Sequence, residues 1–217
     1  MTDACDTFDT FYTFDKNKHS MNDILYKSFQ LLMNDNTDNN SFYSKYITTL
    51  NDFINQRCFS IMQARNLFYC MYRQITYLVE NNIGISFLDL QDIKVINNEI
   101  FFFCNPNKLH YIKNKKITVT EVYDKKHPFL PIEFIQNDTL PFTTYYTSSY
   151  YSLAKLVLYC LAVDNRSNSN SNSNSNSNSN SNSNIDNVLH DYRDSKLYTI
   201  LDLCIQETPT DRHLIFF

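Results

Sequence analysis

Apolar residues recur at helical spacing in five stretches of the chain, at residues 20–33, 42–56, 60–81, 149–163 and 194–206. Within each stretch they stand three or four residues apart, which is the repeat of one face of an α-helix. The pattern therefore predicts five helices. Residues 149–163 are apolar on nearly every side, so we expect that helix to be buried in the core.

Polar residues beside these stretches predict where the helices begin and end. Ser60 and Gln63 have the spacing of a capping box, in which each side chain binds the backbone N–H of the other residue. Ser20 stands where it can cap the first helix. Asn82 and Gly84 follow the third helix, and both residue types adopt the left-handed conformation that ends helices.

In the middle of the chain the apolar pattern changes to short runs, which indicates strands. Residues 93–96 and 100–103 flank Asn97-Asn98, and this arrangement predicts a β-hairpin. A second hairpin is predicted through residues 111–122, with its turn at Asn114. The whole pattern therefore predicts a mainly helical α+β fold with short β-hairpins.

Three segments are predicted to lie outside regular structure. Residues 124–146 contain three prolines and are predicted to be irregular. Residues 167–184 are nine Ser-Asn pairs, a low-complexity run that adds no apolar burial and predicts a disordered insertion. Residues 1–18 repeat Phe8, Phe11 and Phe14 among Asp and Thr. They fit either an acidic-aromatic docking peptide or a frayed terminus that tucks its aromatics against the domain.

Composition excludes several classes of function. The chain has 17 Phe and 16 Tyr but a single glycine, Gly84. Phosphate-binding loops need several glycines, so no P-loop, dinucleotide fingerprint or kinase Gly-rich loop can be present. The net charge is −4 without a basic stripe, and we therefore expect no binding to nucleic acid.

Cysteine and histidine usage predicts neither a metal site nor a cofactor. The six cysteines form no C-x-x-C pair, and the five histidines form no H-E-x-x-H motif. The expectation is reduced cysteines in an intracellular, cytoplasmic protein, because the sequence shows neither a signal peptide nor an apolar run long enough for a membrane span.

Several short motifs stand in a fixed order along the chain. They are Gly84-Ile85 after the long helix, Phe87-Leu88-Asp89-Leu90, Pro131-Ile132-Glu133, Tyr151-Ser152-Leu153-Ala154, and Arg212 after Pro209. This order resembles the C-lobe of a protein kinase, and most closely the divergent kinase-like proteins of large DNA viruses. The abundance of Asn, Ile, Lys, Tyr and Phe, typical of an AT-rich genome, fits such a source.

The resemblance divides the chain into a tail at residues 1–18, a reduced helical N-terminal region at 19–56, and a C-lobe-like domain at 57–217. The domain is interrupted by the Ser-Asn insertion at 167–184. The N-terminal region is too short for a kinase N-lobe, and it also lacks a Gly-rich loop.

The resemblance also implies that the catalytic residues are lost. Asp89 falls on the catalytic-base position of the H-R-D-L-x-x-x-N loop, but Phe87 and Leu88 replace the His and Arg. Lys94 replaces the metal-binding Asn, and its charge would repel Mg²⁺. No Asp stands near Cys104, where the D-F-G motif falls. The implied protein is a pseudokinase with no catalytic residues, in which Asp89 is at most a vestigial base.

Two pairs of residues have alternative interpretations. Asp89 and Asp92 are either a residual metal-binding or acid–base pair, or acceptors that cap the loop through backbone N–H groups. Glu133 and Arg212 match the glutamate of the A-P-E motif and the arginine that pairs with it in kinases. The resemblance implies a structural ion pair, and the alternative is two independent surface residues.

Three functional hypotheses follow. The first is a catalytically inactive kinase-like module that binds a protein partner, without cofactor, nucleic acid or membrane, and with an undetermined oligomeric state. The second is a divergent kinase that retains Asp89 as base, which predicts a nucleotide-sized cleft beside it. The third is an unrelated α+β structural or binding protein, in which Glu133 and Arg212 lie far apart and the helix at 149–163 is not central.

Overall fold

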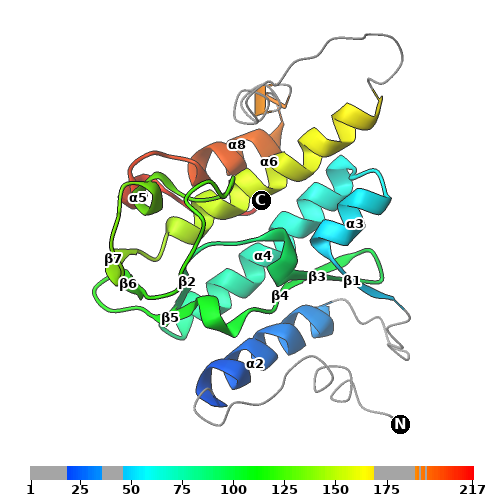
Figure 1. Cartoon of the computed structure of the whole chain (residues 1–217). Helices are drawn as coiled ribbons and strands as arrows, with labels where there is room; N and C mark the ends of the chain where they lie inside the picture. The colour runs from blue at the N-terminus through cyan, green and yellow to red at the C-terminus, as the bar shows by residue number, and fades with distance from the viewer. Residues whose placement is uncertain (1–18, 36–45, 169–188, 191, 194) are drawn as a thin grey trace, which may run out of the picture.

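The computed structural model describes residues 19–35, 46–168, 189–190, 192–193 and 195–217 (Figure 1). Its helices are α2 (His19–Asp35), α3 (Leu50–Gln56), α4 (Ile61–Glu80), α5 (Ile132–Ile135), α6 (Ser148–Asn168) and α8 (Lys196–Cys204). Its strands are β1 (Ile47–Thr49), β2 (Ile83–Ile85), β3 (Ile93–Ile96), β4 (Ile100–Phe103), β5 (Leu109–Tyr111), β6 (Lys116–Val119) and β7 (Phe142–Tyr145). The mixed α+β class is confirmed. The tail at 1–18 and residues 169–184 of the repeat lie outside the described residues.

The two longest helices of the described chain form the centre of the fold. α4 begins at the predicted capping box, where the Gln63 N–H donates to Ser60 Oγ at 3.2 Å and the Ser60 N–H donates to Gln63 Oε1 at 2.8 Å. α6 packs against α4 on one side and α8 on the other (Figure 1). The predictions of helices at 60–81 and 149–163 are confirmed, and Leu153, Leu156 and Val157 of α6 are fully buried.

Residues 42–45 of the helix predicted at 42–56 lie outside the described residues, and the described part is helical only from Leu50. The β-branched residues before it, Ile47–Thr49, form strand β1, which pairs antiparallel with β3. Thr49 then caps α3 by accepting a hydrogen bond from the Asp52 N–H at 3.0 Å. The prediction for Ser20 is also wrong, because α2 begins at His19 and Ser20 lies inside the helix.

The first predicted hairpin is confirmed, and the second forms only as a single bridge at its turn. β3 pairs with β4 through Asn97 and Asn98, whose φ angles of 52° and 66° have the sign that a type I′ turn requires. Lys113 and Lys116 form an antiparallel bridge across the turn at Asn114, but the strands on either side of it pair elsewhere. β5 pairs with β2, and β6 pairs with β7, which lies inside the segment that was predicted to be irregular.

The single glycine is required by close packing and not by a left-handed conformation. A Cβ atom on Gly84 would lie 2.8 Å from Ile117 Cγ2 and 3.1 Å from Tyr146 Cβ. β2 therefore lies so close to β6 and to the residue after β7 that a Cβ atom at position 84 would force Ile117 to shift. The left-handed residue that follows α4 is Asn82, with φ of 59°.

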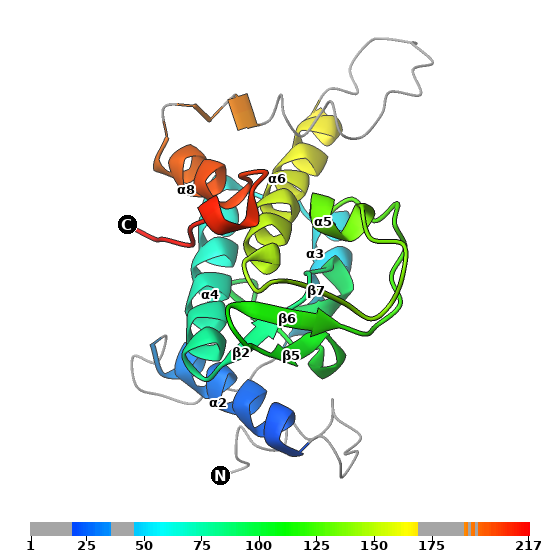
Figure 2. The ribbon, with the colours of Figure 1, turned by 90° about the vertical axis from the view of Figure 1, so that its left-hand side faces the viewer.

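α2 shares the hydrophobic core with the rest of the described chain. Its Phe29 ring meets the Phe102 ring of β4 edge-on, with 4.9 Å between the ring centres. The fully buried Gln74 of α4 accepts a hydrogen bond from the Phe103 N–H at 2.9 Å and donates to the Phe103 carbonyl at 2.9 Å and to Ser28 Oγ at 3.1 Å. Figure 2 shows α2 crossing at the end of the molecule opposite α8. No helix among the described residues is both long enough and apolar enough to span a membrane.

Candidate functional site

The loop that carries Asp89 and Asp92 is held in place by the buried helix α6. It follows β2 and ends in a 3-10 turn, η2 (Leu90–Asp92), directly before β3. Ser152 Oγ of α6 accepts a hydrogen bond from the Leu88 N–H at 2.8 Å and donates to the Leu88 carbonyl at 3.2 Å. The backbone one residue before Asp89 is therefore fixed by the core.

Asp89 is engaged by a histidine from the segment between β6 and α5. Its Oδ2 lies 2.9 Å from Nε2 of His127, and its Oδ1 accepts the Gln91 N–H at 3.3 Å. The hydrogen bond from His127 is the main cause that lowers the pKa of Asp89 below its usual range. A carboxylate with a lowered pKa is a weaker general base, so the environment opposes the role of a catalytic base.

Asp92 is neutralised by a lysine of the same chain. Its Oδ2 lies 2.6 Å from Lys108 Nζ, and its Oδ1 accepts a hydrogen bond from Asn105 Nδ2 at 2.7 Å. Asp92 and Lys108 are each only 9% exposed. The Lys108 ammonium also lies 3.6 Å from the centre of the Phe87 ring, a cation–π contact. The cation beside this carboxylate is therefore an internal side chain.

The position matched to the D-F-G motif contacts Asp92 through three hydrogen bonds. Asn105 donates from its side chain to the carboxylate, and the N–H and thiol of Cys104 donate to the Asp92 carbonyl at 2.8 Å and 3.2 Å. The neighbouring Cys104 is partly buried, and burial raises the pKa of its thiol to about 11, so it is not a thiolate ligand at neutral pH. Lys94 lies in β3, in register with Phe102 of β4. Within the described parts of the chain, no three His, Cys, Asp or Glu side chains are grouped to hold a metal ion.

A second histidine–carboxylate contact joins the segment after β6 to the same loop. Glu121 accepts a hydrogen bond from Ser86 Oγ, and its Oε2 lies 3.0 Å from Nε2 of His110 in β5. Burial opposes ionisation of Glu121, but the neighbouring His110 and Ser86 hold its pKa below the usual value. The contacts of Glu121 with Ser86 and His110 and the contact of His127 with Asp89 together hold residues 120–130 against the loop that carries Asp89.

The structure brings Glu133 and Arg212 together. Arg212 Nη1 donates to Glu133 Oε1 at 2.6 Å, and Nη2 donates to Oε2 at 3.0 Å, which is a bidentate pair. The arginine side chain is fully buried and also donates to the carbonyls of Gln206 and Glu207. Ser148 Oγ donates to Glu133 Oε1 at 2.7 Å. The pair thus ties α5 to the start of α6 and to the chain that follows α8.

A pocket of ≈310 Å³ lies at the junction of α3 and α4, away from the two carboxylates. Residues 54–59 and Val163 line it, and neither Asp89 nor Asp92 is among them. This pocket is therefore not the nucleotide cleft that a residual kinase site beside Asp89 requires.

The sequence does not identify three residues that contact the loop at 86–92 as functional. Lys108 and His127 stand in no recognisable motif, and their partners are 16 and 38 residues away. Ser152 belongs to a motif of the kinase resemblance, but that motif does not indicate that its side chain holds the loop. No local signal predicts these contacts, because each depends on how β5, α6 and the segment after β6 fold onto the loop.

The described residues define a mixed α+β protein in which two loop carboxylates are each bound by a basic side chain of the same chain. Comparison with models of protein families and with curated proteins finds no match to this sequence.

Proposed function

We propose that this chain is a kinase-like protein that does not transfer phosphate and acts by binding a protein partner. The observation that carries the proposal is the pairing of both loop carboxylates with the chain's own side chains, Asp89 with His127 and Asp92 with Lys108. Phosphoryl transfer requires carboxylates that hold Mg²⁺ and a base for the attacking hydroxyl. A metal ion at Asp92 would have to displace a buried ammonium group.

The kinase-like part of the proposal is supported by the order of the elements and by Glu133 and Arg212. These residues are 79 positions apart in the chain, and they form a bidentate pair beside the central helix α6. An unrelated α+β fold gives no reason for these two residues to meet. The anchoring of the Asp89 loop to α6 through Ser152 also fits a kinase-like loop.

The partner-binding part is supported by apolar surface at the corner between α3 and α4. Ile61 and Met62 are 47% and 60% exposed there, next to the pocket that Arg57 and Cys58 help to line. Methionine and arginine are enriched at protein interfaces. The pocket has room for one large apolar side chain, so the expected partner is a protein that presents such a side chain with a polar rim.

The absence of nucleotide binding is tested by thermal unfolding of the full chain with and without millimolar ATP and Mg²⁺. We expect no change in the midpoint, because only a ligand that binds the folded state raises it. Asp89→Asn serves as the control. A rise in the midpoint that Asp89→Asn abolishes would support the divergent kinase and overturn the proposal.

Partner binding is tested by affinity purification of the tagged full chain from its source cells, with Met62→Asp beside the wild type. A charge at the α3–α4 corner should reduce capture of a specific partner by about tenfold or more, which corresponds to roughly 1.4 kcal/mol. The matched control is Ile135→Asp, which places the same charge on a distant exposed isoleucine. Equal capture by the wild type and Met62→Asp would show that this corner is not the binding surface.

A further inference from the structure

We propose that the outer face of α4 binds an aromatic side chain of the protein partner, at the position that Phe216 of the same chain occupies. Residues 213–217, which carry Phe216, are called here the strap. The partner displaces the strap, so the two compete for one surface. This inference rests on the proposed partner binding and adds the surface that is used and the chemistry of the partner.

The surface under the strap is lined by aromatic side chains of α4. The centre of the Phe216 ring lies 4.9 Å from that of Tyr69 and 6.1 Å from that of Tyr72. The Phe68 ring stacks at 6.5 Å, and the Arg65 guanidinium carbon lies 5.7 Å from the centre of the Phe216 ring, within cation–π distance. Figure 2 shows the red segment after α8 crossing α4. Arg65, Phe68, Tyr69 and Tyr72, called here the aromatic site, therefore already hold one ring.

The strap is held less firmly than the core of the protein. At its first residue, the His213 N–H donates to the Leu203 carbonyl at 2.9 Å. Beyond His213, residues 214–217 make no backbone–backbone hydrogen bond to any part of the chain that the structure describes. Residues 214–216 are only partly buried, and Phe217 is 56% exposed. A segment with few backbone hydrogen bonds and little burial opens at low free energy, without unfolding of the core.

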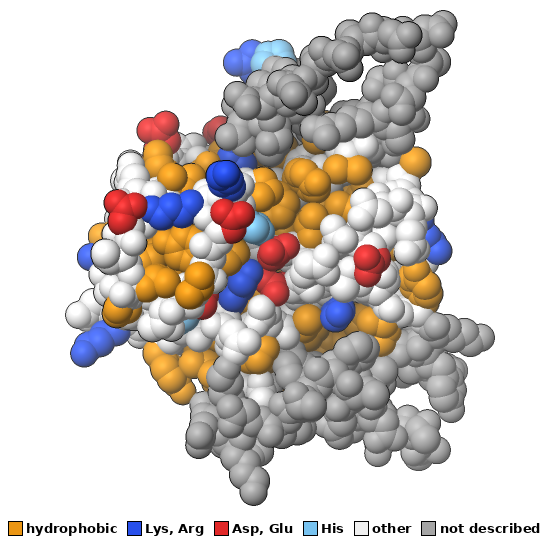
Figure 3. Space-filling model, viewed as in Figure 1, with side chains coloured by type: hydrophobic (Ala, Val, Ile, Leu, Met, Phe, Trp, Pro, Cys, Tyr) orange, Lys and Arg blue, Asp and Glu red, His pale blue; other side chains and the backbone are white. Residues whose placement is uncertain are grey.

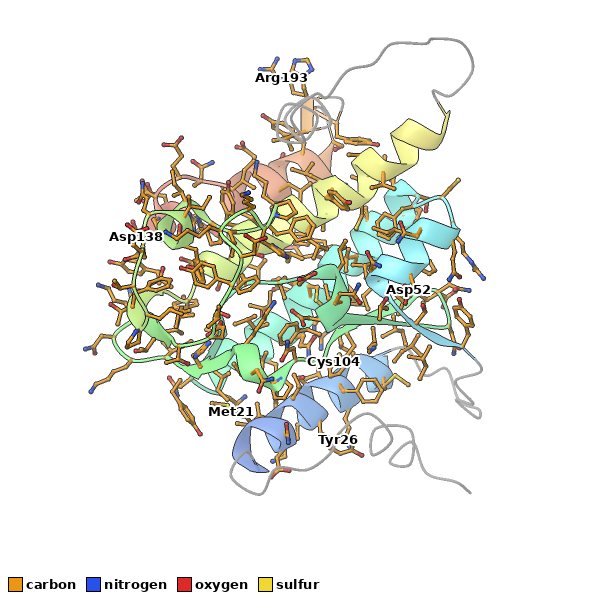
Figure 4. All side chains as sticks on the ribbon, viewed as in Figure 1. Met21, Tyr26, Asp52, Cys104, Asp138 and Arg193 are labelled. Atoms are coloured by element: carbon orange, nitrogen blue, oxygen red, sulfur yellow. The ribbon has the colours of Figure 1, made fainter. Side chains whose placement is uncertain are left out.

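The aromatic site and the α3–α4 corner lie on one face of α4. Met62, Arg65 and Tyr69 follow one another at intervals of three and four residues, which places them in a row along the helix. Met62 and Arg65 are exposed, and Tyr69 is partly buried. The opposite face of α4 is packed into the core, and Figure 4 shows side chains filling the space between α4 and α6. A partner bound at the corner therefore meets the strap as it extends along α4.

The sequence of the strap indicates what the partner presents. Residues 214–217 read Leu-Ile-Phe-Phe, an apolar run that forms neither a helix nor a strand. An aromatic ring buries a large apolar area and loses little conformational entropy, which makes it an efficient anchor. The expected partner is therefore a protein with an extended apolar segment that includes a phenylalanine or a tyrosine.

The test measures binding of a peptide with the sequence of residues 213–217 to the purified full chain. The peptide carries fluorescein through a Gly-Ser spacer, and fluorescence anisotropy reports its binding. We expect Phe216→Ala, which empties the aromatic site, to bind the peptide at least about tenfold more tightly than the wild type, because the tethered wild-type strap competes at an effective concentration in the millimolar range. Phe217→Ala makes the same change at the exposed neighbouring ring and should bind as weakly as the wild type.

A pair of further variants verifies where the peptide binds. Added to Phe216→Ala, the change Tyr69→Ala should reduce the affinity several-fold, because it removes a wall of the aromatic site. The change Ile135→Asp should not, although α5 lies among exposed hydrophobic side chains on the side of the molecule that Figure 3 shows. In Figure 2, α5 and the end of the chain lie on opposite sides of α6.

A second substitution at position 216 covers the case in which Phe216→Ala is unfolded. Phe216→Leu keeps more of the packing and should change the affinity in the same direction, and the melting temperature of each variant verifies that it is folded. Peptide binding that neither variant strengthens, or that Ile135→Asp weakens as much as Tyr69→Ala does, would overturn the inference. The assay contains no partner, so its failure leaves the capture test with Met62→Asp to decide the proposed function.

Discussion

Arg212→Met is expected to lower the free energy of unfolding by about 3–5 kcal/mol, the cost of stranding one member of a buried ion pair. The arginine side chain is fully buried and donates to Glu133 and to two backbone carbonyls. Its guanidinium carbon also lies 4.9 Å from the centre of the Tyr151 ring. Methionine keeps most of the side-chain length but leaves Glu133 without its cation. Urea denaturation of both chains measures the difference.

The control for this prediction is Lys125→Met, which breaks the exposed pair of Lys125 with Asp138. There the lysine and aspartate side chains are 40% and 88% exposed, so solvent screens the pair and its loss should change stability far less than Arg212→Met does. Glu133→Gln combined with Arg212→Met should recover part of the larger loss, because it removes the stranded charge. A loss for Arg212→Met no greater than that of the control would contradict the structural role of the pair.

Elements with local signals were predicted correctly from the sequence, and elements with distant partners were not. α4 carries its own cap at Ser60, and the β3–β4 hairpin carries its own turn at Asn97 and Asn98. β1 has only three residues and exists because it pairs with β3, 45 positions later at Thr49 and Lys94. Its helical neighbours made the same residues look like the start of a helix. Strand pairing at this distance depends on the tertiary fold and leaves no periodic signal.

The same limit applies to the candidate site: residues that stand in a motif can be named from the sequence, and residues that depend on a distant partner cannot. Glu133 and Arg212 could be named because the order of motifs resembles a kinase, although nothing in their immediate surroundings connects them. Lys108 and His127 could not be named, because a single lysine or histidine in a polar loop is usually a solvated residue. Their roles depend on the two aspartates that the fold places beside them. Lys108 Nζ lies 2.6 Å from Asp92 Oδ2, and His127 Nε2 lies 2.9 Å from Asp89 Oδ2.

Lys108→Met is expected to lower the free energy of unfolding by about 3–5 kcal/mol, because it strands the buried carboxylate of Asp92. Asn105 would remain as a donor to Asp92, but no cation would face the carboxylate among the contacts that the structure describes. Asp92→Asn combined with Lys108→Met should recover most of the loss. Urea denaturation of the wild type, the single variant and the double variant measures both effects.

The same variant separates the two kinase-like hypotheses when Mg²⁺ is added. If the loop has lost metal binding, removal of the Lys108 ammonium leaves only the Asp92 carboxylate and the Asn105 amide. Without the substrate phosphates that complete most Mg²⁺ sites, this pair should not hold the ion at millimolar concentration. Millimolar Mg²⁺ should then leave the stability of Lys108→Met unchanged. Restoration of stability by Mg²⁺ in this variant, but not in Asp92→Asn/Lys108→Met, would mean that the lysine occupies a functional metal position. In that case Lys108 would act as an internal inhibitor of a site that is still able to bind metal, and the divergent kinase would become the better hypothesis.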